Sequence, residues 1–272
     1  MKNFSPSPQE IFKSIWRNRY LLKVLIMREV LGRYKGSIFG LLWSFLNPVF
    51  MLLVYTFVFS VIFKARWGGG SDSKIEFALI LFAGLIIFNL FAECLSRSSG
   101  LIIANANYVK KVVFPLEILP IVFLGSALFH ALISYGVWLI AYMIFYGLPH
   151  PTVLMMPLVF IPLIFFILGI TWAFSWLGVY FRDMNQLVGL IITVLMFLSP
   201  IFYPIKSLPE DIQIFAKLNP LAQIIEQSRE ILFWGKIPNL AGYVICLIGS
   251  LLIFFMGFMS FQRARKGFAD VI

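Results

Sequence analysis

The stretch RYKGSIFGLLWSFLNP, residues 33–48, joins a basic segment to a long apolar one. Eight Lys and Arg residues lie before residue 36, and after Lys35 no charged residue follows until Lys64. About 20 apolar residues in a helix are enough to cross a bilayer. The stretch therefore predicts where the chain enters a membrane, with its basic side held in the cytoplasm.

The composition is that of an integral membrane protein. Of the 272 residues, 61% are hydrophobic and 12% are charged, with a mean hydropathy of +0.93. Soluble domains have about 25% charged residues. The net charge of +10 is typical of cytoplasmic loops rich in Lys and Arg, so we expect no nucleic-acid partner. Cys94 and Cys246 have neither disulfide nor metal spacing, and they predict buried free thiols and no metal site.

Long apolar runs predict an all-α membrane protein with six transmembrane helices. Their expected limits are about 36–63, 77–95, 118–146, 152–180, 184–204 and 239–261. In this topology fifteen Lys and Arg residues fall on the side of the N-terminus and seven on the other. The excess predicts that both termini are cytoplasmic, in a multi-pass protein of the inner (cytoplasmic) membrane.

The ends of the chain are expected to lie outside the bilayer. Residues 1–33 predict an amphipathic interface helix in the membrane surface. Its apolar face is expected to carry Phe12, Trp16, Ile26, Met27 and Val30. The transmembrane domain would comprise residues 34–265, and residues 266–272 would form a cytoplasmic tail.

Two polar segments interrupt the transmembrane domain. Residues 97–115 predict a cytoplasmic helix-turn-helix element that ends at Pro115. Residues 205–238 predict two short helices, 209–217 and 220–233, that dip into the outer side of the membrane. Ser207 is expected to cap the first of them and Asn219, followed by Pro220, the second.

Motifs for catalysis or nucleotide binding are missing from the sequence. It has no Gly-x-x-x-x-Gly-Lys-[Ser/Thr] loop to hold ATP phosphates, and no nucleophile elbow or zinc helix. His130 is the ionisable residue expected deepest in the membrane, where a hydrogen-bonded packing role is commoner than proton transfer. Arg182 and Asp183 fit either a surface ion pair or a turn that docks on a partner.

Several motifs together resemble the type-2 ABC export permeases that move polysaccharides. They are RYKGS, GLLW and LNP within 33–48, YFRD at 180–183, SPIFY at 199–203 and LNPL at 218–221. The resemblance covers nearly the whole chain. It extends to O-antigen, capsule and teichoic-acid permeases alike.

The resemblance implies a homodimer of this chain with two copies of a separate ATPase subunit. ATP and Mg would bind that subunit, so this chain would be a permease without catalytic residues or a cofactor of its own. The cargo would be a lipid-linked polysaccharide, O-antigen first and capsular polysaccharide or teichoic acid as alternatives. Membrane lipids would surround the dimer.

The resemblance also assigns residues to roles. Contacts that couple the permease to the ATPase would come from Asn105, Asn107, Tyr108, Lys110 and Lys111, with Arg182 and Asp183 as secondary contacts. The short helices in 205–238 would gate the outer side. The first and fifth spans would line the channel, with rings from Trp43, Tyr55, Phe59, Phe197, Phe202 and Tyr203.

Three other classes stay open from the residues alone. A drug or small-lipid exporter would share the six spans but lack the 33–48 motif. An ion-coupled transporter or channel would depend on His130 or Glu93. A membrane-embedded glycan-modifying enzyme would need a cluster of carboxylates or histidines on one face.

Overall fold

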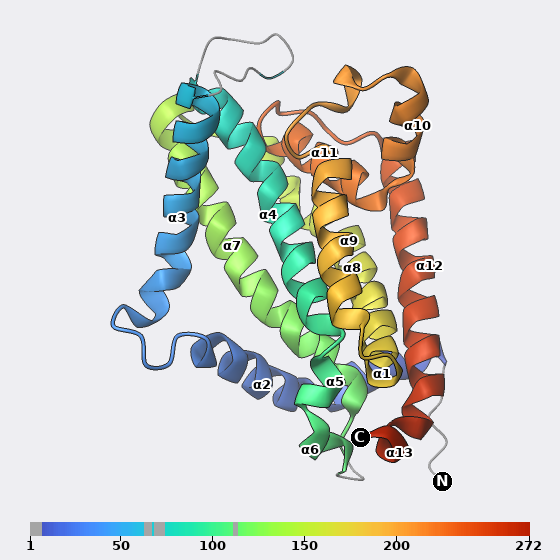
Figure 1. Cartoon of the computed structure of the whole chain (residues 1–272). Coiled ribbons are helices and arrows are strands. Elements are labelled where there is room, and N and C mark those ends of the chain that lie inside the picture. The colour runs from blue at the N-terminus through green and yellow to red at the C-terminus, as the bar shows by residue number, and fades with distance from the viewer. Residues whose placement is uncertain (1–6, 63–66, 68–73, 111–113) are drawn as a thin grey trace.

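The computed structural model describes residues 7–62, 67, 74–110 and 114–272, and every regular element in these ranges is helical (Figure 1). Apolar helices run lengthwise through the molecule. They are α3 (Trp43–Tyr55, between η1, Gly40–Leu42, and the π-helix η2, Thr56–Ile62), α4 (Lys74–Ser98), α7 (Leu119–Tyr146), α8 (Met156–Tyr180), α9 (Met184–Leu198) and α12 (Leu240–Ala264).

The two ends of this bundle differ. At one end, which we call the basic end, lie α1 (Pro8–Arg17), α2 (Arg19–Gly32), α5 (Leu101–Ala104), α6 (Ala106–Val109) and α13 (Phe268–Val271). At the opposite end, the far end, lie α10 (Glu210–Leu218) and α11 (Pro220–Leu232). Figure 1 shows α2 running across the basic end, below the bundle helices.

Five stretches of the described chain are long and apolar enough to cross a bilayer. They are Gly40–Phe59, Ile75–Ser98, Leu116–Tyr146, Pro151–Tyr180 and Leu240–Val271. The first begins at Gly40 and not at 36, because the chain turns at Gly36, whose φ is +84°.

The fifth predicted span is shorter than expected. Helix α9 ends at Leu198, and the chain turns at Ser199–Pro200 instead of continuing to 204. Its 15 residues cover about 22 Å at 1.5 Å per residue, less than the roughly 30 Å of a hydrocarbon core. The prediction of a full helical span over 184–204 is therefore wrong as to its end.

The N-terminal segment forms two helices instead of one. The break falls at Asn18, whose backbone is non-helical and whose Nδ2 donates to the Ser14 carbonyl at 2.8 Å. The prediction of a single apolar face is also wrong, because Val30 is buried whereas Phe12, Trp16 and Met27 are exposed. Helices α1 and α2 thus have some apolar side chains that pack against the protein and others that are exposed and suited to contact lipid.

The two short helices after residue 205 lie close to their predicted limits. Asn219 caps α11 as expected, its Oδ1 accepting from the Leu221 N–H at 3.0 Å. The expected cap at Ser207 is wrong, since Ser207 donates to the Pro204 carbonyl and Pro209 precedes α10. Helix α11 packs inside the protein, with six fully buried apolar residues, Leu221, Ala222, Ile224, Ile225, Ile231 and Leu232, and its depth in the membrane stays a prediction.

Burial divides the bundle helices into two groups. Helix α4 is the most enclosed, with 78% of its apolar window buried, against 11% for the window that contains α3. In α3 only Ser44 and Pro48 are buried, and in α9 only Val188. Helices α3 and α9 therefore present wide apolar faces that the single chain does not cover. Cys94 and Cys246 are buried and free, as predicted.

Helices α8 and α12 make the closest contact through glycines. A Cβ on Gly257 would lie 2.0 Å from the carbonyl oxygen of Gly169, and one on Gly169 would lie 2.4 Å from that of Ile253. Small residues at such crossings let helix backbones approach closely in a membrane, where packing and not hydrophobic exclusion drives association. This pair of helices forms a rigid side of the bundle.

We expect Gly257→Val to lower the thermal stability of the purified protein, because overpacking costs about 1–3 kcal/mol and here the clash is with backbone. The measurement is the melting temperature in detergent, followed by size-exclusion chromatography. Gly249→Val on the same helix is the matched control, because nothing lies within 4 Å of its added Cβ. Equal melting temperatures for both variants would contradict the close contact.

Candidate functional site

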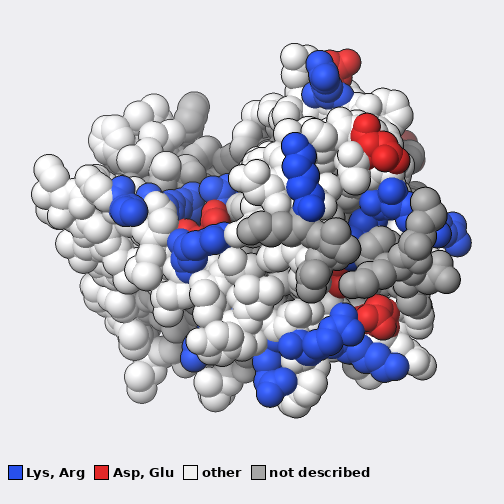
Figure 2. All heavy atoms as spheres, turned by 90° about the horizontal axis from the view of Figure 1, so that it is seen from below, with Lys and Arg blue, Asp and Glu red and all other residues white. Residues whose placement is uncertain are grey.

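The basic end carries many Lys and Arg side chains, with a few acidic side chains among them (Figure 2). Polar contacts join α2 to its neighbours there. Arg28 donates to the Tyr108 hydroxyl at 3.1 Å, and Arg97 of α4 pairs with Glu29 at 2.7 Å. These contacts fix α2 against α4 and α6 although each exposed pair adds little stability by itself.

The predicted coupling residues divide into two groups. Asn107 and Lys110 are exposed, whereas Asn105 donates to the Leu101 carbonyl and Tyr108 stacks on Phe114 at 4.2 Å between ring centroids. Asn105 and Tyr108 therefore hold the α5–α6 element together. Asn107 and Lys110 are left available to a partner, and Lys111 lies outside the described residues.

The turn after α8 lies beside that element. Arg182 and Asp183 are both exposed. Arg182 lines a cavity of about 430 Å³ together with Ile103 of α5 and Asn185 of α9. The structure thus places one secondary contact next to the main predicted coupling element.

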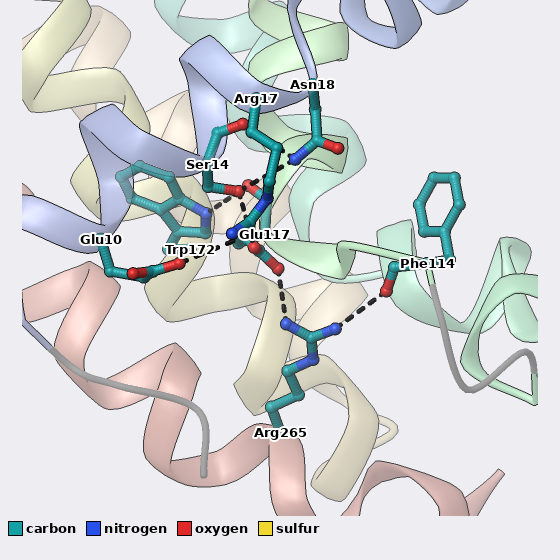
Figure 3. A network of polar contacts seen from close by, with 8 residues as sticks. All are labelled: Glu10, Ser14, Arg17, Asn18, Phe114, Glu117, Trp172 and Arg265. Carbon is teal, nitrogen blue, oxygen red and sulfur yellow. Dashed lines mark hydrogen bonds and ion pairs between the residues drawn. The ribbon is translucent and has the colours of Figure 1, made fainter. Parts of the chain in front are cut away.

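A buried carboxylate connects four elements at the same end (Figure 3). Glu117, in η3 (Leu116–Ile118), accepts from Ser14 of α1 at 2.8 Å and from Arg265 of η6 (Arg265–Gly267) at 2.5 Å. Arg265 also donates to the Phe114 carbonyl, and the indole of Trp172 in α8 donates to the Glu117 carbonyl. This network links the interfacial helix, the α6–α7 connection, α8 and the end of α12.

Sequence reasoning missed this network. The available signal was Glu117 itself, because no other Asp, Glu, Lys or Arg occurs between 118 and 181. A lone carboxylate at the start of so long an apolar run requires a cationic partner from elsewhere in the chain.

At the far end, three of the predicted channel rings are in contact and a fourth residue, Tyr203, is hydrogen-bonded to one of them. Phe59 stacks on Phe202 at 5.8 Å, and Phe202 lies 6.2 Å from Phe197. The Tyr203 hydroxyl donates to the Phe197 carbonyl at 2.7 Å. These four residues, which we call the ring cluster, connect η2 with the end of α9.

The remaining two predicted rings lie elsewhere. Trp43 begins α3 near the basic end, where its ring meets Phe39 edge-on at 5.6 Å. Tyr55, at the end of α3, packs half-buried against the core. The structure does not bring either of them into the ring cluster.

Arg229 of α11 is fully buried and holds the segment that follows α9. Its guanidinium donates to the carbonyls of Ile80 at 3.1 Å, Pro200 at 2.5 Å and Ile201 at 2.7 Å. Glu226 pairs with it at 3.1 Å, and the Trp67 ring lies 4.4 Å away, under the cation. Arginine suits this position because five N–H donors leave one planar group in fixed directions.

Burial lowers the pKa of Arg229 to about 10, and at neutral pH the guanidinium remains charged. The sequence alone placed Arg229 only among the charges of the outer side. Its spacing of three from Glu226 on a predicted helix was the signal that the two pair.

A comparison with known families identifies the chain. Residues 20–233 match a model described as ABC-2 type transporter, which is well over half of the sequence. The chain belongs to the ABC-2 type transporter family. With five stretches able to cross a bilayer, this ABC-2 chain is a multi-pass membrane protein.

Relatives of this ABC-2 chain extend over almost its whole length. The O-antigen export system permease protein RfbA of Klebsiella pneumoniae is 30% identical over 255 residues, covering 93% of this chain and 95% of the relative. RfbA of Myxococcus xanthus is 25% identical, covering 96% and 99%. The polysialic acid transport protein KpsM of Escherichia coli is 27% identical, covering 90% and 93%.

We expect Glu117→Gln to destabilise the ABC-2 chain by about 3–5 kcal/mol, the usual loss when a buried ion pair is broken and one charge is left unpaired. The control is Glu10→Gln. Glu10 pairs with Arg17 at 3.4 Å, and the Arg17 side chain is exposed, so this pair contributes about 1 kcal/mol or less. Chemical denaturation in detergent measures both. Similar losses for the two variants would contradict the network in Figure 3.

We expect Arg229→Met to lower the melting temperature, because three buried carbonyls lose a donor and each unpaired group costs about 1–3 kcal/mol. Lys236→Met removes the same charge from an exposed site at the far end and is expected to melt like the wild type. If the two variants had the same melting temperature, the role of Arg229 in holding the Pro200 and Ile201 carbonyls would be refuted.

Proposed function

We propose that this chain is the membrane-spanning permease of an ATP-driven exporter that moves a lipid-linked polysaccharide out of the cytoplasm. An O-antigen is the first candidate for that polysaccharide. The observation that carries the proposal is the similarity, over 93% of this chain, to the RfbA O-antigen export permease of Klebsiella pneumoniae. Capsular polysaccharide is the second candidate, favoured over teichoic acid by the match to the capsule polysaccharide export protein CtrC of Neisseria meningitidis.

The protein acts in the inner membrane. In support, the capsule polysaccharide export inner-membrane protein CtrC of Neisseria meningitidis is 21% identical over 94% of this chain. Six crossings complete the topology if α9 together with residues 199–203 makes the fifth. Both termini are then cytoplasmic, in agreement with the excess of Lys and Arg on that side.

ATP is hydrolysed on a separate subunit. The sequence has no phosphate-binding loop of the Walker type, so the work must come from an ATPase partner with its Mg and ATP. Two copies of the ATPase bind a homodimer of this chain, and this chain itself catalyses no reaction. An ion-coupled mechanism is disfavoured because Glu93, one of its two candidate carriers, pairs with Arg33 at 2.6 Å.

The polysaccharide passes between the two copies. Helices α3 and α9 support this path because their apolar faces are largely uncovered in one chain. The ring cluster lies where these two helices end, so sugar rings can stack on it while their hydroxyls keep water. The helices α10 and α11 close the far end, and Arg229 ties the Pro200–Ile201 segment to them.

ATP binding is transmitted at the basic end. Asn107, Lys110 and the Arg182–Asp183 turn are exposed for the ATPase. A movement of α6 is passed to α2 through the contact between Tyr108 and Arg28, and the chain continues from α2 through the turn at Gly36 and η1 to α3. ATP acts only if the ATPase holds one arrangement of these elements more tightly than the other, since equal affinity would shift no population.

The test uses a strain that makes a surface polysaccharide and lacks the gene for this chain. Wild-type chain is expected to restore the surface glycan and to purify with the ATPase. Lys110→Glu with Lys111→Glu is expected to lose both, because two charges are reversed at the proposed contact. Lys206→Glu with Lys236→Glu makes the same charge change at the far end and is expected to retain both.

Normal surface glycan in the deletion strain would refute the export function. Retained ATPase binding by the Lys110→Glu, Lys111→Glu variant would refute the coupling assignment alone.

A further inference from the structure

A cavity of about 170 Å³ with a mixed polar and apolar lining lies between α3, α4 and α7. It is located where the 33–48 stretch enters the bundle, on the side of α3 that faces α4. Its polar lining comes from Arg33, Tyr34, Asn47, Asn89, Glu93 and His130. A cavity of this size has room for several water molecules or for a single sugar ring.

Asn89 is a polar, exposed residue on an otherwise apolar and buried part of α4. Between residues 77 and 95 of α4, Asn89 is the single exposed position, and the rest of that stretch is buried or half-buried. Asn47, on α3, is exposed as well and lines the same cavity. Amide side chains inside a membrane are costly unless they find hydrogen-bond partners, so two of them at one cavity indicate a ligand with donors and acceptors.

His130 adds unused hydrogen-bonding capacity. Its Nδ1 lies 3.3 Å from the Tyr34 hydroxyl, whereas its Nε2 is buried and has no hydrogen-bond partner among the described residues. Ser134, one turn further along α7, also lines the cavity and donates to the His130 carbonyl. A buried polar atom without a partner costs free energy, and the residue that carries this one lines the cavity.

The charges at the cavity cancel. Arg33 and Glu93 pair at 2.6 Å, and the other polar groups that line the cavity are amides, hydroxyls and an imidazole. A phosphate group would require an excess of cations and would meet the Glu93 carboxylate. Neutral donors and acceptors around a compensated ion pair instead suit a neutral polyhydroxyl ligand.

We propose that this cavity is a subsite for one sugar residue of the exported chain, held by Asn47, Asn89 and Tyr34. The proposal rests on the export function argued above and adds a binding site beside α3, one of the two helices proposed to line the path. Asn89 lies about 13 Å from the end of α4 at Ser98, at 1.5 Å per residue. A glycan moving from the basic end therefore meets this hydrogen-bonding subsite before it reaches the ring cluster.

The direct test is photocrosslinking in the complete exporter, in cells that make the polysaccharide. The photoreactive amino acid p-benzoylphenylalanine replaces Asn89, or Leu252 on the exposed face of α12 as a control. A third replacement, at Phe202, probes the ring cluster. Irradiation is expected to give a glycan adduct at positions 89 and 202 and none at 252.

A second pair of variants covers the case in which the bulky probe blocks the path. Asn89→Leu removes the amide and is expected to reduce the rate of surface glycan appearance roughly three- to tenfold, the value of one lost hydrogen bond. Asn89→Gln keeps an amide and is expected to restore most of it. Both variants should bind the ATPase as the wild type does.

The outcomes separate the subsite from the export function. A glycan adduct at 202 but none at 89, with normal export by Asn89→Leu, would overturn the subsite and leave the function standing. Adducts at 89 that contain only phospholipid would overturn it as well. Normal glycan in a strain without this chain would remove the function and the subsite together.

Discussion

The bilayer interior offers no water to bind a buried polar group, so a charge placed there is costly unless other parts of the protein pair with it. Glu117 and Arg229 show how the protein meets this constraint at its two ends. At the basic end one carboxylate receives donors from α1 and η6. At the far end one guanidinium serves carbonyls from α4 and the segment after α9. Each buried charge therefore fixes the relative position of elements that are distant in sequence.

These two anchors leave α3 and α9 as the least constrained parts of the bundle. Helices α8 and α12 touch backbone to backbone at Gly169 and Gly257, and α4 is enclosed on most sides. By contrast, α3 connects at the basic end to α2, and α9 connects at the far end to the clamped Pro200–Ile201 segment. In this arrangement a partner that binds α2 or α6 can move α3 or α9, which line the proposed export path, while the packing of α4, α8 and α12 stays unchanged.

The sequence predicted the elements that depend on local pattern. Apolar runs located the long helices, and Asn219 followed by Pro220 located the start of α11. It did not predict the break at Asn18 or the early end of α9. At both places the backbone turns although the apolar pattern of the sequence continues. It also missed the pairing of Glu117 with Arg265, 148 residues apart, and of Arg229 with the Ile80 carbonyl, 149 residues apart. Such partners depend on how helices pack. Four of the six predicted channel residues lie together in the ring cluster, but their role in lining a channel and the contacts assigned to the ATPase both stay predictions.

Gly84 shows what the far-end anchor demands of the rest of the chain. A Cβ at this position would lie 2.7 Å from Nη2 of Arg229, the atom that donates to the Ile201 carbonyl. The guanidinium cannot withdraw without giving up that bond. A side chain at residue 84 would therefore displace the Arg229 guanidinium and weaken its hold on the Ile201 carbonyl.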